Sequence, residues 1–309
     1  MKYFCTYFDR NFIYQGLALY QSLLEHAGEF TIWVLCFDEP TYELLNRLNL
    51  PNLRTIQLED FEQAYPDLLA VKRDRSFVEY YWTATPMLPK YIFNSHPEVL
   101  KLAYLDADLF FYSDIQAIYS EWGDGSIYLI PHRFAPEHRE SGELEAGLYN
   151  VGFVGFRKTD SGLAAIEKWT QQNIEWCYDR IEPGKLGDQK YLHDWADNYS
   201  GVVVSQNIGI GAGGWNIMNY RLKIKDENIT IDDEQVIMLH LNFVELVRKN
   251  IMLGMPRFKY RKIYKPYAEA LRFSIHSINS IDSDFSPQFP RVSIYRFIYS
   301  VLRGGVLRV

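Results

Sequence analysis

Two carboxylates separated by one small residue, Asp106-Ala107-Asp108, directly follow the apolar run Leu102 to Leu105. Such a run predicts a buried strand, and its end would hold both carboxylates near one point. Hard divalent cations bind several oxygen ligands at about 2.0–2.6 Å, which suits this pair. A cation that bridges a diphosphate neutralises the charge that builds up on a phosphate leaving group. The alternative is an Asp that caps the next segment beside a second Asp in solvent.

The elements that would position this pair alternate between strand-like and helix-like patterns. Short apolar runs predict strands, and apolar residues at helical spacing predict helices. Strands are expected at residues 2–8, 30–37, 53–58, 101–105, 109–112, 127–131, 149–157 and 236–241. Helices are expected at residues 12–26, 40–48, 76–93, 115–122 and 161–178, and a polar loop at 132–145. The alternation predicts an α/β sandwich with parallel strands joined by crossover helices.

The composition is that of a folded chain with a large core. Of the 309 residues, 48% are hydrophobic and 23% charged, and the 16% that are aromatic suit a cleft that stacks on rings. The three cysteines, Cys5, Cys36 and Cys177, form no C-x-x-C pair. We therefore expect no disulfide framework, no zinc site and a reducing cytosol. The N-terminus lacks the apolar stretch of a secretory signal, and no apolar run approaches the length of a spanning helix.

Charge is distributed unevenly along the chain. The net charge is -7, yet Phe243 to Val309 contains twelve lysines and arginines and only four acidic residues. Within it, residues 286–309 interleave arginines with aromatic and aliphatic residues. Such stretches bind the interface of anionic membranes, so attachment to the inner membrane face is one expectation. A C-terminal helix packed on the domain with its arginines in water is the other. Nucleic-acid binding is not expected, because the region that bears the paired aspartates is acidic.

Further polar motifs follow the paired aspartates in a defined order. They are Tyr149-Asn150-Val151-Gly152-Phe153, Gly187-Asp188-Gln189, Gly213-Gly214-Trp215-Asn216 and His240. The whole series resembles the metal-dependent glycosyltransferases of the GT-A fold, and is most similar to the family-eight, galactosyltransferase-like retaining group. The resemblance implies a Rossmann-like, nucleotide-diphospho-sugar transferase sandwich at residues 1–243. Residues 244–309 would then form a basic, aromatic C-terminal helical extension.

The resemblance also implies a role for each matching residue. Asp106, Asp108 and His240 would hold Mn²⁺ or Mg²⁺. Asp188 and Gln189 would be the catalytic pair. A nucleotide-diphosphate sugar, with UDP favoured, would bind Thr6, Tyr7, Asp9, Asp106, Ala107, Asn150, Trp215 and Asn216. The segment after the first strand would take the base and ribose, with an aromatic ring stacked on the base. A turn capped by Asp9 is the alternative there, and a core position is the alternative for Trp215.

The identity of residue 189 bears on stereochemistry, because an amide cannot act as a general base whereas a carboxylate can. If Gln189 lies under the anomeric carbon, retention is favoured, and the leaving phosphate would help to deprotonate the acceptor. If Asp188 reaches the acceptor hydroxyl, it can serve as the base for inversion. The family pattern favours retention.

Three departures from the family pattern concern charge near the substrates. Lys190 follows Asp188 and Gln189 where an acid is usual. Tyr81 to Pro86 stands where relatives often carry an arginine, and the segment that usually grips phosphate after the metal His is Leu241-Asn242-Phe243. The positive charges that could compensate are Lys72, Arg73, Arg75, Lys249 and Lys265. Separately, residues 209–214 are glycine-rich and predict a flexible loop near the sugar pocket, not a dinucleotide fingerprint.

Two other enzyme classes fit less well. A phosphohydrolase of this type usually has Thr or Val two residues after the second Asp, where this chain has Phe110. A nucleotidylyltransferase usually has a Gly-rich, basic loop after the first strand, which Thr6 to Phe12 does not provide. A noncatalytic carbohydrate- or nucleotide-binding protein of the same fold is the main alternative. We predict a cytoplasmic glycosyltransferase that acts on a saccharide or lipid-linked acceptor in surface polysaccharide or lipopolysaccharide synthesis.

Overall fold

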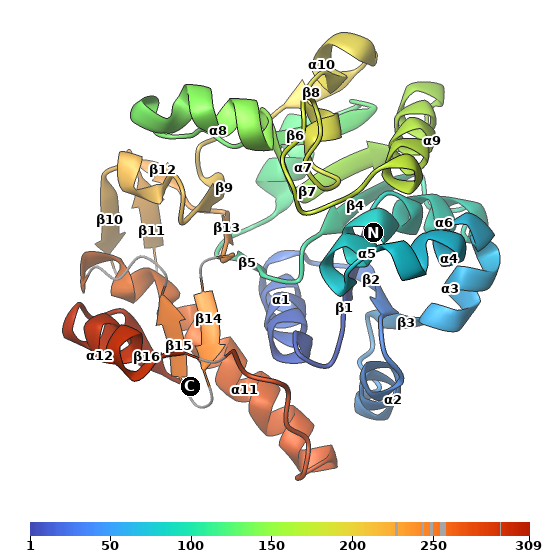
Figure 1. The fold of residues 1–309 in the computed structure, drawn as a ribbon. Helices are drawn as coiled ribbons and strands as arrows, with labels where there is room; N and C mark the ends of the chain where they lie inside the picture. Colours follow the sequence, from blue (N-terminus) through green and yellow to red (C-terminus); the bar gives the residue numbers. More distant parts are fainter. Residues whose placement is uncertain (226–227, 243, 248–249, 254–257, 291) are drawn as a thin grey trace.

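The computed structural model describes residues 1–225, 228–242, 244–247, 250–253, 258–290 and 292–309. A seven-stranded sheet in the order β3-β2-β1-β4-β7-β6-β8 forms its centre (Figure 1). The strands are β1 (Lys2–Phe8), β2 (Phe30–Cys36), β3 (Leu53–Gln57), β4 (Lys101–Leu105), β6 (Ile127–Pro131), β7 (Tyr149–Arg157) and β8 (Val202–Val204). The first four sheet positions are parallel, as predicted, but β7 runs antiparallel to both β4 and β6.

One face of this sheet is covered by α1 (Ile13–His26), α2 (Glu39–Leu48), α7 (Gln116–Trp122) and α11 (Lys265–Ile281). Side chains alternate along β1, so Phe4 and Phe8 point into this layer. α1 lies so close to the sheet that a Cβ on Gly16 would be 2.2 Å from Phe8 Cε1. α11 packs along α1 on its outer side (Figure 1). The C-terminal segment thus belongs to the same apolar core as the first strand.

The opposite face is covered by α3 (Leu58–Ala64), α4 (Pro66–Val71), α5 (Phe77–Ala84), α6 (Met87–Ser95), α9 (Asp160–Glu175) and α10 (Trp195–Asn198). α5 begins at a capping box, in which the Ser76 hydroxyl accepts from Glu79 N and the Glu79 carboxylate accepts from Ser76 N. The predicted helix at 76–93 is broken before Met87, because Pro86 lacks an N–H group and starts the second helix.

Three small sheets complete the part of the fold that the structure describes. The sheet that matters for the site contains β5 (Leu109–Phe111), β13 (Met238–His240) and β9 (Ile210–Gly213), with β13 in the middle. The other two are β10 (Leu222–Lys225) with β11 (Asn228–Ile231) and β12 (Glu234–Gln235), and β14 (Val244–Val247) with β15 (Asn250–Leu253) and β16 (Val306–Arg308). The remaining α-helices are α8 (Arg139–Ala146) and α12 (Ile294–Leu302). Short 3₁₀ turns lie at Lys72–Asp74, Pro136–His138, Lys190–Leu192, Ile217–Asn219 and Phe258–Tyr264.

Two local predictions are wrong. Residues 132–145, predicted to be a polar loop, contain most of α8, which buries none of its residues and therefore shows no apolar period. Residues 209–214, predicted to be a flexible loop, contain β9, whose residues are all buried. Glycine is needed beside β9 for close packing, since a Cβ on Gly209 would lie 1.9 Å from Gln235 O.

None of the helices in the described part of the chain is long and apolar enough to cross a lipid bilayer. All three cysteines are free and buried.

Candidate active site

The paired aspartates form the connection between β4 and β5. Asp106 N donates to Gly152 O at 2.8 Å, and Leu109 N donates to Asp106 O at 3.1 Å. Ala107 is 8% exposed and packs into the core, so the aspartate side chains on either side of it face the opposite way. The small residue between the acids is therefore the anchor of the turn, and the acids are free to face a ligand.

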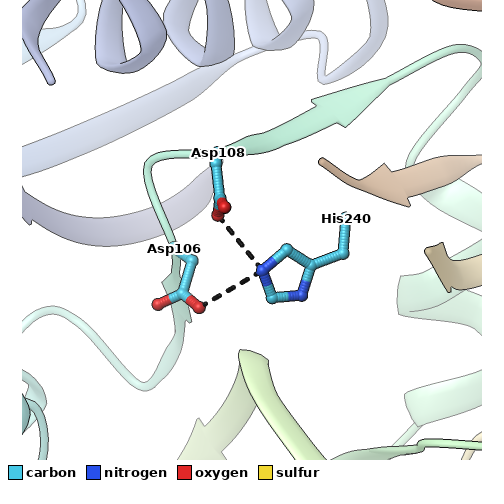
Figure 2. A group of neighbouring side chains, drawn as sticks. All are labelled: Asp106, Asp108 and His240. Carbon is cyan, nitrogen blue, oxygen red and sulfur yellow. Dashed lines mark ion pairs between the residues drawn. The ribbon is translucent and has the colours of Figure 1, made fainter. Parts of the chain in front are cut away.

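His240 ends β13 and faces both carboxylates (Figure 2). Its Nε2 lies 3.1 Å from Asp108 Oδ1 and 3.6 Å from Asp106 Oδ2. One ligand atom from each of the three residues lies within 4.8 Å of the others. Burial lowers the pKa of His240, but the negative charges of Asp108 and Asp106 outweigh this effect and raise the pKa above its ordinary value. Two carboxylates and an imidazole at this spacing form a donor set that can hold a divalent metal ion.

A cavity of about 440 Å³ opens beside this cluster. Trp82, Phe134 and Trp215 give it aromatic walls, while carboxylates and amides supply its polar groups. Seven predicted site residues line it, namely Asp106, Asp108, Asn150, Asp188, Gln189, Trp215 and His240. Aromatic walls with a few convergent polar groups are typical of a site for a small polar ligand that contains rings.

Asp188 and Gln189 lie next to each other in the cavity but in different environments. Burial, together with the negative charge of Asp106, raises the pKa of Asp188 to about 7, although a hydrogen bond from Thr85 acts against this. Gln189 Oε1 accepts from Asn150 Nδ2 at 3.2 Å and from Val151 N at 3.3 Å, and Gln189 Nε2 donates to Ala146 O at 3.2 Å. Asp188 can therefore exchange a proton near neutral pH, whereas Gln189 is held as a neutral polar surface.

The residues predicted to bind the base and ribose lie at the carboxyl end of β1, outside the lining of this cavity. The Tyr7 ring lies among three other aromatic rings, with its hydroxyl 3.0 Å from Thr85 Oγ1. Asp9 accepts from Asn11 N at 2.9 Å and from the Tyr81 hydroxyl at 3.2 Å. Thr6 is buried, and its hydroxyl has no hydrogen-bond partner in the described part of the chain.

The residues after β9 hold the cavity wall in place. Trp215 Nε1 and Asn216 Nδ2 both donate to His132 O at 2.7 Å. Asn216 Oδ1 accepts from Gly213 N at 3.0 Å, and Asn216 is 1% exposed. Trp215 thus lines the cavity, while the Asn216 side chain forms hydrogen bonds to the surrounding backbone.

Sequence reasoning missed His132 and Phe134, whose rings stack at 4.6 Å on the cavity wall. Burial lowers the pKa of His132 to about 4, so the ring is neutral at neutral pH. The available signal was its position directly after the predicted strand at 127–131, since polar residues at strand ends gather around ligands. Trp82 was noted only for replacing an arginine, yet it lines the cavity.

The described cations named as compensating charges are engaged elsewhere, or lie outside the cavity lining. Lys72 pairs with Glu62, and the Arg75 side chain, 1% exposed, pairs with Asp74. Lys265 Nζ lies 4.0 Å from Glu269 Oε1 on the exposed start of α11. Arg73 does not line the cavity. Phe243 and Lys249 lie outside the described residues.

Lys190, which stands where the family pattern has an acid, ties α8 to the cavity loop. Its Nζ donates to Glu143 O at 2.6 Å and to Leu144 O at 2.7 Å, and the residue is 8% exposed. An acid could not make these contacts, because carbonyl groups at a helix end require a donor. The substitution therefore stabilises the wall of the cavity.

No family model matches this chain. The chain is 32% identical over 295 residues to the uncharacterised protein YfnD of Bacillus subtilis strain 168, and the match covers 93% of this chain and 94% of YfnD. This chain belongs to the YfnD family. A second protein of that organism, the uncharacterised YfnF, is 29% identical over 293 residues, or 92% of this chain and 96% of YfnF.

Solved structures show which fold this chain shares. The galactosyltransferase LgtC, crystallised with donor and acceptor sugar analogues, matches with a TM-score of 0.53 at 16% identity, over 95% of this chain and 98% of LgtC. The glycosyltransferase GlyE of Streptococcus pneumoniae matches with a TM-score of 0.51 at 15% identity, over 94% of this chain and 66% of GlyE. The predicted GT-A, mixed α/β fold is thus confirmed.

Proposed function

We propose that this chain is a divalent-metal-dependent glycosyltransferase that moves a sugar from a nucleotide-diphosphate donor, with UDP favoured, to a saccharide or lipid-linked acceptor. The observation that carries the proposal is the Asp106, Asp108 and His240 cluster on the wall of the 440 Å³ cavity. The shared fold with LgtC, which was crystallised with donor and acceptor sugar analogues, supports the same class of substrates.

The three clustered side chains would hold Mn²⁺ or Mg²⁺. When bound, the ion would supply positive charge for the two phosphates and for the leaving group. The buried Ala107 keeps the Asp106 and Asp108 carboxylates on the side of the cavity. Tyr104 OH donates to Asp106 Oδ1 at 2.7 Å, which orients that carboxylate.

The donor would extend from the metal toward the end of β1. Thr6, Tyr7 and Asp9 lie there, and the aromatic rings around Tyr7 suit a flat base. The sugar would lie in the cavity against Trp215, with Asn216 fixing that wall. The apolar face of a sugar ring stacks well on indole, which supports this placement.

Asp188 and Gln189 would face the reacting sugar. The amide of Gln189 has no proton-accepting basic group, so it would orient the sugar instead of activating a hydroxyl. Burial raises the pKa of Asp188 to about 7, and this carboxylate would hold or release a proton beside the reaction centre. We infer a retaining reaction, in agreement with the family-eight resemblance.

The proposal is tested by incubating the protein with Mn²⁺ and a panel of UDP-, GDP-, dTDP- and CMP-sugars, and measuring the release of free nucleotide. We expect release from one donor, abolished by EDTA and by Asp108→Ala. Asp124→Ala is the matched control, because that carboxylate is 97% exposed and lies outside the cavity lining. No release and no metal-dependent nucleotide binding by calorimetry would contradict the proposal and favour a noncatalytic binding protein.

For location, we propose a cytoplasmic protein that attaches to the inner membrane face through α12. The helix exposes six apolar or aromatic side chains by 48–83%, namely Ile294, Tyr295, Ile298, Tyr299, Val301 and Leu302. Arg303 and Arg308 follow them, with charges that suit anionic lipid. This position would place the enzyme where polysaccharide or lipopolysaccharide precursors are assembled.

The attachment is best tested with surface variants, because removing residues 286–309 would also remove β16 from its sheet. We expect Tyr295→Ser combined with Leu302→Ser to lower sedimentation with anionic vesicles, while neutral vesicles bind weakly in either case. Phe77→Ser, which changes a side chain that is 83% exposed on α5, is the control. Unchanged sedimentation of the double variant would contradict the attachment.

A further inference from the structure

The side-chain amide of Asn150 is connected on both sides within the cavity wall. Its Oδ1 lies 2.9 Å from Gly152 N and 2.9 Å from His240 Nδ1. Its Nδ2 lies 3.2 Å from Gln189 Oε1 and 3.4 Å from His132 Nε2. An amide has two acceptor positions on oxygen and two donor hydrogens on nitrogen, so these four contacts use its full capacity.

One fixed group in this network sets the direction of every other contact. The backbone N–H of Gly152 can only donate, so the atom of Asn150 that faces it must be the oxygen. The ring nitrogen of His240 that faces the same oxygen must then carry its hydrogen. In the neutral imidazole, the form that binds a metal ion, the lone pair is consequently on Nε2, which is the atom that faces Asp106 and Asp108.

We propose that Asn150 is a positioning residue for the metal site: it holds His240 with Nδ1–H donated and Nε2 aimed at the ion. This inference rests on the metal dependence of the proposed function, but not on sugar transfer. Metal-binding histidines are commonly fixed through the second ring nitrogen in this way, and loss of the outer partner typically weakens metal affinity by about 10–100-fold. This role is separate from the direct donor contact that the sequence predicted for Asn150.

Gly152 supports the same assignment independently. A Cβ at this position would lie 2.6 Å from both Nδ1 and Cε1 of His240, and 2.7 Å from Asn150 Oδ1. Gly152 therefore leaves room for the contact between the His240 imidazole and the Asn150 amide, because it has no side chain. A methyl group there would separate the two partners without removing either one.

The far side of Asn150 is anchored as well. His132 Nδ1 lies 2.9 Å from Gly147 O, to which it donates, so His132 Nε2 is left as the acceptor for Asn150 Nδ2. Gln189 Oε1 accepts from the same Nδ2. Because Gln189 lies in the reacting part of the cavity, Asn150 joins the metal ligand to the group proposed to orient the sugar.

The test measures Mn²⁺ affinity without nucleotide, from the free-Mn²⁺ signal in electron paramagnetic resonance. We expect Asn150→Ala to raise the dissociation constant by about 10–100-fold. Asn150→Asp keeps an acceptor for His240 and Gly152, so its Mn²⁺ affinity should stay within a few-fold of the wild type. The same Asp variant should slow sugar transfer, since a carboxylate oxygen would face Gln189 Oε1. Asn173→Ala, which removes another buried amide, should leave Mn²⁺ affinity unchanged.

Gly152→Ala provides a second test that keeps Asn150 intact and should weaken Mn²⁺ binding to a similar extent. Equal Mn²⁺ affinities for the wild type, Asn150→Ala and Gly152→Ala would overturn the inference and leave the metal site standing. An Asn150→Asp variant as weak as Asn150→Ala would also overturn it. A wild type that binds no Mn²⁺ would overturn the inference and the metal dependence together. Tight, Asn150-dependent Mn²⁺ binding with no sugar transfer would support the inference and contradict only the proposed activity.

Discussion

Replacing Asp188 with Asn should make the metal-free protein more stable at alkaline pH. Burial and the neighbouring Asp106 raise the folded-state pKa of Asp188 from 3.8 to about 7. Between these two values the folded protein keeps a proton that the unfolded chain has released, so the stability of the wild type falls as the pH rises through this window. Above this pH window, the buried Asp188 carboxylate is charged and destabilises the folded protein, whereas a neutral amide of the same shape does not.

The size of the effect follows from the shift. Each pKa unit corresponds to about 1.4 kcal/mol, so the full shift of about three units corresponds to about 4 kcal/mol. Between about pH 5 and about pH 8, the wild type should lose about 3 kcal/mol of this stability relative to Asp188→Asn. Titrating groups that do not interact with Asp188 are common to both proteins and cancel in the difference.

The assay is urea unfolding of the EDTA-treated wild type and variant at both pH values, with the difference in unfolding free energy compared between them. Asp124→Asn, a change at a 97% exposed carboxylate, is the control and should give the same small difference at each pH. A difference between wild type and Asp188→Asn that does not change with pH would refute the reasoning. The Asp188→Asn variant should at the same time lose nucleotide release. The Asp188 carboxylate would then be needed for activity although it lowers the stability of the folded protein.

Two further substitutions test contacts that hold the cavity wall and the helix α9. Lys190→Met removes the ammonium group that donates to the last carbonyls of α8. We expect the free energy of unfolding to fall by about 2 kcal/mol and proteolysis within α8 to become faster. Unchanged proteolysis would show that Lys190 does not hold α8 in place. Thr159→Ala removes the N-cap of α9, in which Thr159 Oγ1 accepts from Gly162 N at 3.1 Å. We expect it to lower the free energy of unfolding in urea by about 1 kcal/mol, whereas Thr159→Ser should leave it nearly unchanged. An equal loss of stability in both variants would contradict capping.

Strands and helices with one clear apolar period were predictable from the sequence, but the sheet order was not. A largely buried strand such as β7 is mostly apolar on both faces, so its pattern is the same whether it runs parallel or antiparallel to its neighbours. α8 was missed for the opposite reason, because it buries no side chain and its sequence resembles a polar loop. In both cases the deciding information lies in tertiary contacts, which local patterns do not contain.

In the candidate site too, some features could be predicted from the sequence and others depend on tertiary contacts. Asp106, Asp108 and His240 were predicted as one metal cluster, because the series of motifs resembles a metal-dependent family, and the structure brings the three side chains together. The link from His240 through Asn150 to His132 was not predicted, since it depends on which way each polar group points. Sequence reasoning therefore finds which residue types could bind an ion, whereas the structure is needed to see what orients them.

The packing of α11 on α1 sets a condition on how the chain folds as it is synthesised. Tyr14 in α1 meets Phe285 with ring centroids 5.9 Å apart, and Asn11 Oδ1 accepts from Gln288 N at 2.8 Å. The N-terminal residues are synthesised first, yet residues 265–288, which cover the outer face of α1, emerge only near the end of synthesis. The first strands can pair early, but this apolar helix face stays open to other chains until then. We expect translation that stops near residue 243 to yield an aggregating fragment instead of an independently folded domain of residues 1–243.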